Sequence, residues 1–464
     1  MEQRRMTKRS YEMDMCRGPL AGKILMFSLP LIFSGILQLL FNAADLVVVG
    51  KFAGDISDQA LAAVGSTGSV TNLITGAFIG LSTGANVLVA QLYGASDHQK
   101  LSKAVHTAIT LAFISGVVLV GVGLLVARPL LEWMETPADV IDLSELYMRI
   151  IFCGMPANML YNFGSAILRS IGDTKRPLYF LLIAGSLNVV LNLVFVICFH
   201  MNVAGVALAT VISQVLSAVL ILICLFRMDG PCKLSWRHLG INGEATLKIA
   251  RVGLPAGLQG CIFSISNVLI QSSINSFGSL AMAGSTSAAN IEGFIYIAMN
   301  AVYQAALSFT SQNFGAKQYK RINKVFAVCA MLVTVVGLLL GLLAILLKRP
   351  LLSLYTDDPV VADFGVFRMN VIVTTYFFCG LMEVCTGVMR GIGYSILPMC
   401  VSLAGACGLR VLWIYTLFAA DRTMTMLYLS YPVSWAITTL VHFLCFLVAR
   451  RKLPKENVPL EDAA

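Results

Sequence analysis

The sequence predicts an all-α polytopic membrane protein, with twelve transmembrane helices in two six-helix bundles related by internal duplication. The first observation behind this prediction is composition: 58% of the 464 residues are hydrophobic and only 12% are charged, whereas an ordinary soluble domain carries about 25% charged residues. The second is that the apolar residues form blocks long enough for a helix of roughly 20 residues to cross a bilayer. The third is that motifs of the first half recur in the second.

The apolar blocks fall into two groups of six. The first group lies between a charged tail at residues 1–23 and a basic linker at 227–251, and the second group is followed by a basic tail at 450–464. We therefore expect an N-terminal bundle over 24–226 and a C-terminal bundle over 252–449. The twelve blocks lie at residues 24–50, 59–92, 103–127, 142–168, 177–199, 203–226, 252–277, 281–313, 324–347, 361–389, 395–419 and 424–449.

Basic residues gather in alternate loops, at 100–103, 169–176, 227–251 and 317–324, and most loop acids lie in the other loops. Lys and Arg mark the cytoplasmic loops of membrane proteins, so we expect both termini to be cytoplasmic. This placement accounts for the net charge of +9 without a nucleic-acid partner. The scattered cysteines form no zinc-spaced cluster and are interpreted as small core residues.

Three motifs recur at a spacing of 221 residues. VAQLYGA (89–95) returns as TSQNFGA (310–316), RPLLEWMETP (128–137) as RPLLSLYTDDP (349–359), and ILRSIGDTKRP (167–177) as VMRGIGYSILP (388–398). Because each half has an even number of spans, the two copies share one orientation. Transporters built from two such halves bind substrate between them and alternate access, although some channels and membrane enzymes are also duplicated.

Two residues of the first apolar block are unusual for an inert anchor. Pro30 removes a helix hydrogen bond and favours a kink. Asp45 places a carboxylate deep in the block, where a charge costs on the order of 3 kcal/mol. Intramembrane acids commonly mark ion pathways, so Asp45 is a functional candidate; the alternative is a buried carboxylate that only ties helices together.

Other polar groups could join Asp45. Asn188 and Asn192 are four residues apart and so share one helix face, and Thr210 adds a hydroxyl on the next helix. Carboxylate, amide and hydroxyl oxygens suit a hard cation such as sodium, by analogy with other hard ions. The alternative is that these side chains hydrogen-bond one helix to another, and their spacing alone favours that alternative.

Ionisable residues in the C-terminal half are few. Glu292 and Glu383 lie inside apolar stretches and are expected to face an aqueous cavity. The alternative is that each is an interior polar group that only links helices. The duplication places Asn162 opposite Glu383. We take Arg410 as the one basic residue inside a span and expect it to pair with an acid or with backbone carbonyls in a structural role.

Enzyme motifs are absent: the sequence has no HExxH, GxSxG or GxxxxGK[ST]. The missing P-loop argues against an ATP-driven pump on this chain. No metal or cofactor is expected.

With these motifs the chain resembles the multidrug and toxic compound extrusion (MATE) family over essentially its whole length. The segments that support this resemblance are LPLIFSGILQLLFNAADLVVVGKFAG in the first span and the repeated motifs after the second, fourth, eighth and tenth spans. The resemblance implies two six-helix bundles and drug export driven by sodium or proton entry. It assigns ion coupling to Asp45, Asn188, Asn192 and Thr210, and a conformational kink to Pro30.

The sequence departs from that family at Asn192, where one branch has an aspartate. One negative charge is therefore missing, and we expect the N-terminal half to neutralise only one proton or one sodium ion per cycle. The seventh-span glutamate of another branch is also absent, since Phe263 and Ser264 lie near its position. Whether Glu292 or Glu383 replaces it is left open.

The hypothesis from sequence is a monomeric antiporter of the bacterial inner membrane. It exports amphipathic, cationic drugs or metabolites in exchange for protons or sodium ions. Glu292, Glu383 and Asn162 are assigned to the substrate cavity or to a second ion site. One alternative is a flippase for a lipid-linked precursor, which should favour a basic cavity, whereas the spans are counted as holding three acids and one arginine. A membrane-embedded enzyme is a further alternative.

Overall fold

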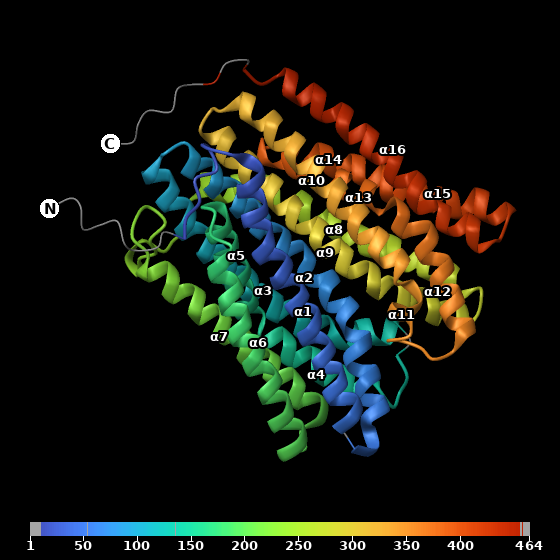
Figure 1. The fold of residues 1–464 in the computed structure, drawn as a ribbon. Helices are drawn as coiled ribbons and strands as arrows, with labels where there is room; N and C mark the ends of the chain where they lie inside the picture. The colour runs from blue at the N-terminus through green and yellow to red at the C-terminus, as the bar shows by residue number, and fades with distance from the viewer. Residues whose placement is uncertain (1–10, 53, 135, 455–456, 458–464) are drawn as a thin grey trace. The chain divides into compact units, whose positions relative to one another are not determined.

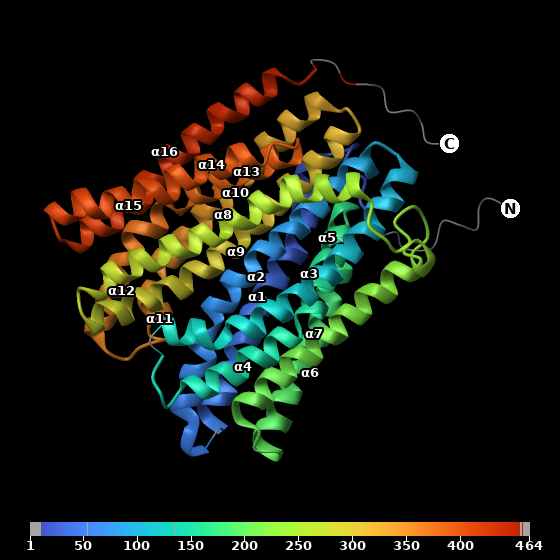
Figure 2. The same cartoon turned by 180° about the vertical axis from the view of Figure 1, so that it is seen from behind.

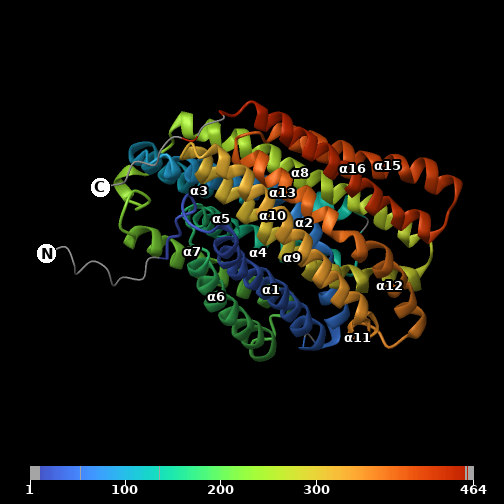
Figure 3. The same cartoon turned by 45° about the horizontal axis from the view of Figure 1, so that its top comes forward.

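The computed structural model describes residues 11–52, 54–134, 136–454 and 457, and every regular element in these ranges is a helix (Figures 1 and 2). The chain divides into two units, Met1–Ile249 and Ala250–Ala464. Within each unit, long helices run alongside one another as a bundle (Figure 3). The all-α fold predicted from the sequence is confirmed.

The N-terminal unit is built from seven α-helices and three short turns of other helical types among its described residues. Its elements are α1 (Leu20–Phe52), the 3₁₀ turn η1 (Gly54–Ile56), α2 (Ser57–Gly94), α3 (His98–Trp133), α4 (Ile141–Cys153), α5 (Met155–Ser170), α6 (Lys175–Leu193), the π-helical turn η2 (Val194–Cys198), α7 (Asn202–Arg227) and the 3₁₀ turn η3 (Trp236–His238).

The core of this unit lies where α2, α3 and α5 pack together, and α1 packs on α6, which packs on α7. Leu101, Leu119 and Phe163 are fully buried there. The opposite side of α3 exposes large apolar residues such as Phe113 and Leu125. A helix with apolar residues on its outer side fits a lipid environment, because lipid replaces water around it.

The C-terminal unit follows the same order of six predicted spans, with more breaks within its helices. It contains α8 (Gly243–Asn275) from Ala250 onward, the first turns of this helix belonging to the N-terminal unit. Its other elements are α9 (Ser279–Gly315), α10 (Tyr319–Leu346), α11 (Lys348–Leu352), α12 (Pro359–Ile372), the 3₁₀ turn η4 (Val373–Thr375), α13 (Tyr376–Gly391), α14 (Ile396–Ser402), the π-helical turn η5 (Leu403–Gly408), α15 (Leu409–Trp413), the π-helical turn η6 (Ile414–Phe418) and α16 (Met424–Arg451). Its core lies where α9 packs on α10, α12 and α13.

All twelve predicted spans coincide with a helix or with consecutive helical segments. Ten of these, among the described residues, are long and apolar enough by themselves to cross a membrane. The other two are α9, which is long but rich in small polar residues, and the α4–α5 pair, which is broken at Gly154. The break has a local cause, since Pro156 lies in the first turn of α5 and has no N–H to donate to α4.

The linker region differs from its prediction at one end. Helix α8 begins at Gly243, inside the segment expected to be a linker. The side chain of Asn242 explains this start, because its Oδ1 accepts a hydrogen bond from the Ala245 N–H at 3.0 Å, in the manner of a helix N-cap.

Candidate functional site

The predicted coupling residues of the N-terminal unit meet in one buried cluster. Asp45 on α1 is 8% exposed, and its Oδ1 accepts a hydrogen bond of 2.5 Å from Asn192 Nδ2 on α6. Its Oδ2 accepts one of 3.4 Å from the Thr210 hydroxyl on α7. Asn188 completes the network: its Oδ1 accepts from Asn192 at 3.2 Å, and its Nδ2 donates to Thr210 at 3.3 Å.

Local sequence explains why these four side chains converge. Asn188 and Asn192 are one turn apart on α6, just before the π-helical turn η2, a feature that often accompanies functional sites. Helix α6 approaches α1 closely at Gly185, where an added Cβ would lie 1.8 Å from the Phe41 ring.

The cluster has the chemistry of a site for a small cation. Among the described residues, Oδ1 of Asn192 has no hydrogen-bond partner, although Asn192 is fully buried. A buried acceptor without a donor is unusual in proteins. Together with the Asp45 carboxylate and the Thr210 hydroxyl, it forms an oxygen-rich set of the kind that hard cations prefer. A proton on Asp45 would neutralise the same carboxylate.

Pro30 lies inside α1, which continues as one helix from Leu20 to Phe52. The residue is buried, and its carbonyl oxygen accepts a 2.9 Å hydrogen bond from the Ser34 hydroxyl. This geometry describes one state of α1, so the role of Pro30 as a kink stays a prediction.

Asn162 lies on α5 and is not among the hydrogen-bonding partners of the Asp45 cluster. Its Nδ2 donates to the main-chain and side-chain oxygens of Asn158, both at 2.9 Å. Its assignment to a substrate cavity stays a prediction.

Glu292 on α9 forms a buried ion pair, which corrects the expectation that it faces an aqueous cavity. Both of its carboxylate oxygens accept hydrogen bonds from Arg368 on α12, from Nε at 2.9 Å and from Nη2 at 2.8 Å. Arg368 also donates to the Ser285 hydroxyl at 2.8 Å. Both partners are less than a tenth exposed, so the negative charge of Glu292 is neutralised in place.

Arg410 is not the one basic residue inside a span, because Arg368 and Arg390 are buried as well. Arg390, on α13, donates to the Tyr303 hydroxyl and to Gln259 Oε1, both at 2.8 Å. The count of three acids to one arginine is therefore wrong. Arg368 lies within the predicted span 361–389, so its position alone could have identified it; its pairing with Glu292 could not be read from the sequence.

Arg410, on α15, contacts neither an acid nor a backbone carbonyl in the interactions found for the described residues. Its Nε donates to the Ser434 hydroxyl at 2.8 Å, and its guanidinium lies over the rings of Tyr431 and Trp435. The predicted pairing of Arg410 was therefore wrong. Glu383, on α13, is half-buried two turns before Arg390.

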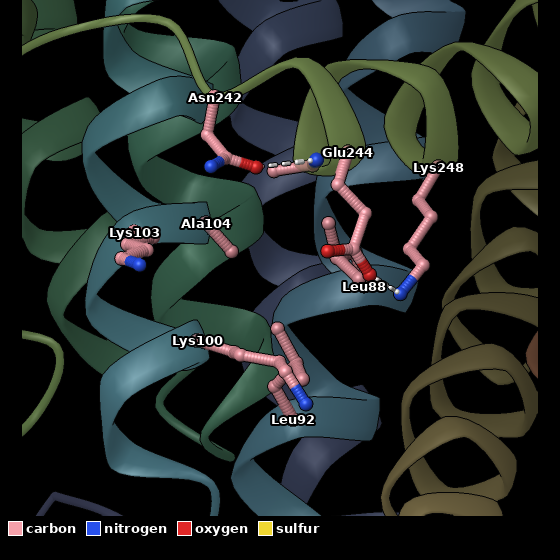
Figure 4. A pocket seen from close by; sticks show the side chains of 9 residues that line it. Leu88, Leu92, Lys100, Lys103, Ala104, Asn242, Glu244 and Lys248 are labelled. Atoms are coloured by element: carbon pink, nitrogen blue, oxygen red, sulfur yellow. Dashed lines mark hydrogen bonds and ion pairs between the residues drawn. The ribbon is translucent and has the colours of Figure 1, made fainter.

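A separate pocket of about 100 Å³ lies in the N-terminal unit (Figure 4). Two of its lysines are paired with acids: Lys248 with Glu244 at 2.6 Å, and Lys100 with Asp97 at 3.1 Å. It is lined by none of the predicted site residues. The residues that line it are Leu88, Leu92, Lys100, Lys103, Ala104, Asn242, Glu244, Ala245 and Lys248.

Comparison with known proteins identifies the family that this sequence matches. The sequence profile of the MatE family matches residues 30–194 and 255–416. The chain is 27% identical over 424 residues to the "Probable multidrug resistance protein YoeA" of Bacillus subtilis, with 90% of this chain and 91% of that protein covered. It is 26% identical over 372 residues to the "FAD transporter" of Shewanella oneidensis, with 78% and 80% covered.

A solved structure shares the fold. It is described as the "outward-facing conformation of a multidrug resistance MATE family transporter of the MOP superfamily", and it is 22% identical in sequence. It superposes with a TM-score of 0.87 over 95% of this chain and 98% of that one.

Proposed function

Because this chain belongs to the MatE family, we propose that it exports amphipathic small molecules in exchange for protons or sodium ions. Family membership makes it a multi-pass membrane transporter of small molecules and not an enzyme. The direction of transport, the antiport and the coupling ion are our proposal. We place it in the bacterial inner membrane, as a functional monomer with both termini in the cytoplasm.

The observation that carries the proposal is the buried Asp45 carboxylate beside Asn192, whose amide oxygen has no hydrogen-bond partner in the described part of the chain. A coupling ion can shift the transporter between two states only if it binds one state more tightly than the other. Proton or sodium binding at Asp45 removes the charge that Asn192 and Thr210 stabilise. We propose that α1 then changes its path at Pro30 and that the substrate is released outward.

The charge count of the site limits the coupling. Asn192 contributes an amide where a second carboxylate would add a charge, so the Asp45 cluster carries one negative charge. One monovalent cation neutralises it. We therefore propose that one proton or one sodium ion is exchanged per cycle at this site.

The substrate class is the least constrained part of the proposal. Names of similar proteins include multidrug resistance and FAD transport, which are chemically different cargoes. Organic cations are the first substrates to test. Glu292 no longer supports that choice, because Arg368 neutralises it, so the support rests on Asp45 and Glu383.

One observation favours a second candidate, a flippase for an anionic lipid-linked precursor. The spans of the C-terminal unit also bury Arg390 and Arg410, whose hydrogen-bond and cation–π partners among the described residues are hydroxyl, amide and aromatic groups and not acids. A phosphate-bearing cargo favours a basic environment.

The deciding experiment measures transport of a fluorescent organic cation in proteoliposomes, with a pH gradient or a sodium gradient imposed separately. The wild-type protein is compared with Asp45→Asn and with Asp357→Asn, which removes an exposed acid as a control. We expect one gradient to drive transport, and we expect Asp45→Asn to reduce it at least tenfold while the control matches wild type.

The other outcomes of this transport assay would each contradict a part of the proposal. Gradient-driven transport that survives in Asp45→Asn would show that coupling does not depend on this carboxylate. Failure of both gradients with wild-type protein would reject cation antiport, and a fluorescent anionic lipid would then be tested for movement between leaflets.

A further inference from the structure

The C-terminal unit contains a buried positive charge that the proposed ion coupling does not use. Arg410 is 3% exposed. Its Nε donates to the Ser434 hydroxyl, but its Nη2 has no hydrogen-bond partner among the described residues. A buried N–H group without an acceptor is costly, and more so when it carries charge.

The Arg410 guanidinium makes cation–π contacts with two aromatic rings. Its Cζ lies 4.3 Å from the centre of the Tyr431 ring and 5.2 Å from that of Trp435. Rings that lie over a guanidinium contribute cation–π stabilisation but do not replace in-plane acceptors for its N–H groups. The edge is where the N–H groups point, and a carboxylate fits a guanidinium edge to edge.

The neighbouring ion pair does not supply the missing negative charge. Arg368 and Glu292 satisfy each other through two parallel hydrogen bonds. Arg368 also lies over Tyr431, at 5.8 Å, so this ring contacts both guanidinium groups. The two arginines and one glutamate leave a formal net charge of one positive unit. On α13, Arg390 and Glu383 add one charge of each sign and leave this net charge unchanged. Charges inside membranes are generally paired, so this excess calls for an anion.

The internal duplication relates this excess charge to the region of the Asp45 cluster in the other copy of the repeat. Tyr431 lies 221 residues after Thr210, the spacing of the repeated motifs. Arg410 lies just before the π-helical turn η6, as Asn188 and Asn192 lie just before η2. By that spacing Arg410 corresponds to Val189, the neighbour of Asn188. The same region of the repeat therefore holds a carboxylate in one unit and a guanidinium in the other, on different helices, which implies ligands of opposite charge.

We propose that Arg410 binds the carboxylate of a small organic acid or zwitterion, with Tyr431 and Trp435 in contact with its apolar body. A monoanion balances the single excess charge, whereas a phosphate dianion would leave a negative charge buried. The inference rests on the proposed function only in taking this ligand to be a transported molecule. It adds a carboxylate to the cargo, which the choice of organic cations alone did not include.

The test measures thermal unfolding of the purified full-length protein in detergent micelles, with benzoate as the probe. A ligand that binds the folded state raises the apparent Tm in a saturable way. We expect benzoate to do so and neutral benzamide, of nearly the same shape, not to. Arg410→Gln should weaken benzoate binding at least tenfold, and Arg422→Gln, which removes an exposed arginine, should leave it unchanged.

A second variant keeps the test decisive if Arg410→Gln does not fold. Arg410→Lys keeps the charge but lacks the planar edge, and it should weaken benzoate binding several-fold. The proposal is overturned if wild type shows no saturable benzoate effect, if benzamide acts equally, or if neither Arg410 variant weakens binding. Chloride acting as well as benzoate at equal concentration would show an inorganic-anion site and overturn the carboxylate assignment.

The binding measurement uses no ion gradient, so it is independent of the transport assay. Benzoate binding at Arg410 together with failed coupling would reject the antiport and keep the anion site. Coupled transport without benzoate binding would reject the anion site and keep the antiport.

Discussion

Burial of Glu292 and Arg368 inside the C-terminal unit removes a carboxylate and a guanidinium from water, and two hydrogen bonds between them offset that loss. Each charge is stable there because the other is present. The same reasoning separates this pair from Arg410, whose Nη2 is left without an acceptor in the described part of the chain. At the residue scale, the partner of a buried charge decides whether it is structural or available to a ligand.

The ion pair predicts a strongly non-additive pair of mutations. Glu292→Gln leaves the Arg368 charge buried without its partner and should destabilise the protein by about 3–5 kcal/mol. The double variant Glu292→Gln/Arg368→Gln removes both charges and should be more stable than the single variant. Apparent Tm values in detergent give the comparison. A double variant whose loss equals the sum of the single losses would contradict the buried pair.

Sequence reasoning succeeded at residues related by local spacing. Asn188 and Asn192 share a face because they are one helical turn apart, and the structure has them hydrogen-bonded. It failed for Glu292 and Arg368, which are 76 residues apart. Their pairing depends on how α9 and α12 are rotated against each other, and that rotation is set by packing of the whole unit. The coupling roles of the Asp45 cluster came from family resemblance and stay predictions.

At the scale of elements, close approach between helices determines where polar groups can meet. Helix α1 reaches α6 at Gly185, where a side chain would collide with Phe41. This contact holds the Asp45 and Asn192 helices together. The apolar length of these helices predicted their presence but not the residues at which they begin and end. The start of α8 depends on the Asn242 cap, and the break between α4 and α5 depends on Gly154 and Pro156.

Glycine-to-alanine changes should have opposite effects at two positions. Gly185→Ala places a methyl group against Phe41 and should destabilise the protein by about 1–3 kcal/mol. Gly121, on α3, has open space around it. Gly121→Ala should therefore be neutral or stabilising by up to about 1 kcal/mol, since alanine favours the helix more than glycine does.

Thermal unfolding in detergent distinguishes the two glycine variants. Gly185→Ala should also weaken gradient-driven transport, because it moves α1 relative to α6. A Gly185→Ala protein as stable as Gly121→Ala would show that α1 and α6 tolerate a wider separation.

At the scale of the whole chain, the duplication unites the two units. The repeat of three motifs at one spacing predicted the order of helices, and both units follow it. The repeat did not predict the Asp45 carboxylate of one unit or the Arg410 guanidinium of the other, because a duplicated backbone constrains side-chain position more than side-chain type. Asp45 and Arg410 have accordingly become sites for ligands of opposite sign in our proposals.

The twelve-span topology requires the α4–α5 segment to cross the membrane, which can be tested. The α4–α5 segment is broken and does not count by itself as a long apolar helix. If it crosses the membrane, Asp139 before it lies outside the cell and Lys175 after it lies inside; both are exposed in the structure. In a cysteine-free background, Asp139→Cys should react with a membrane-impermeant maleimide on intact cells.

Lys175→Cys in the same background should react only after the membrane is permeabilised. The positive-inside rule favours this side for the 169–176 loop, which carries Arg169, Lys175 and Arg176. Equal labelling of both positions on intact cells would mean that α4–α5 does not cross. The six-helix N-terminal bundle would then be wrong, and the parallel orientation of the two repeats would fail with it, because that orientation requires an even number of crossings in each half.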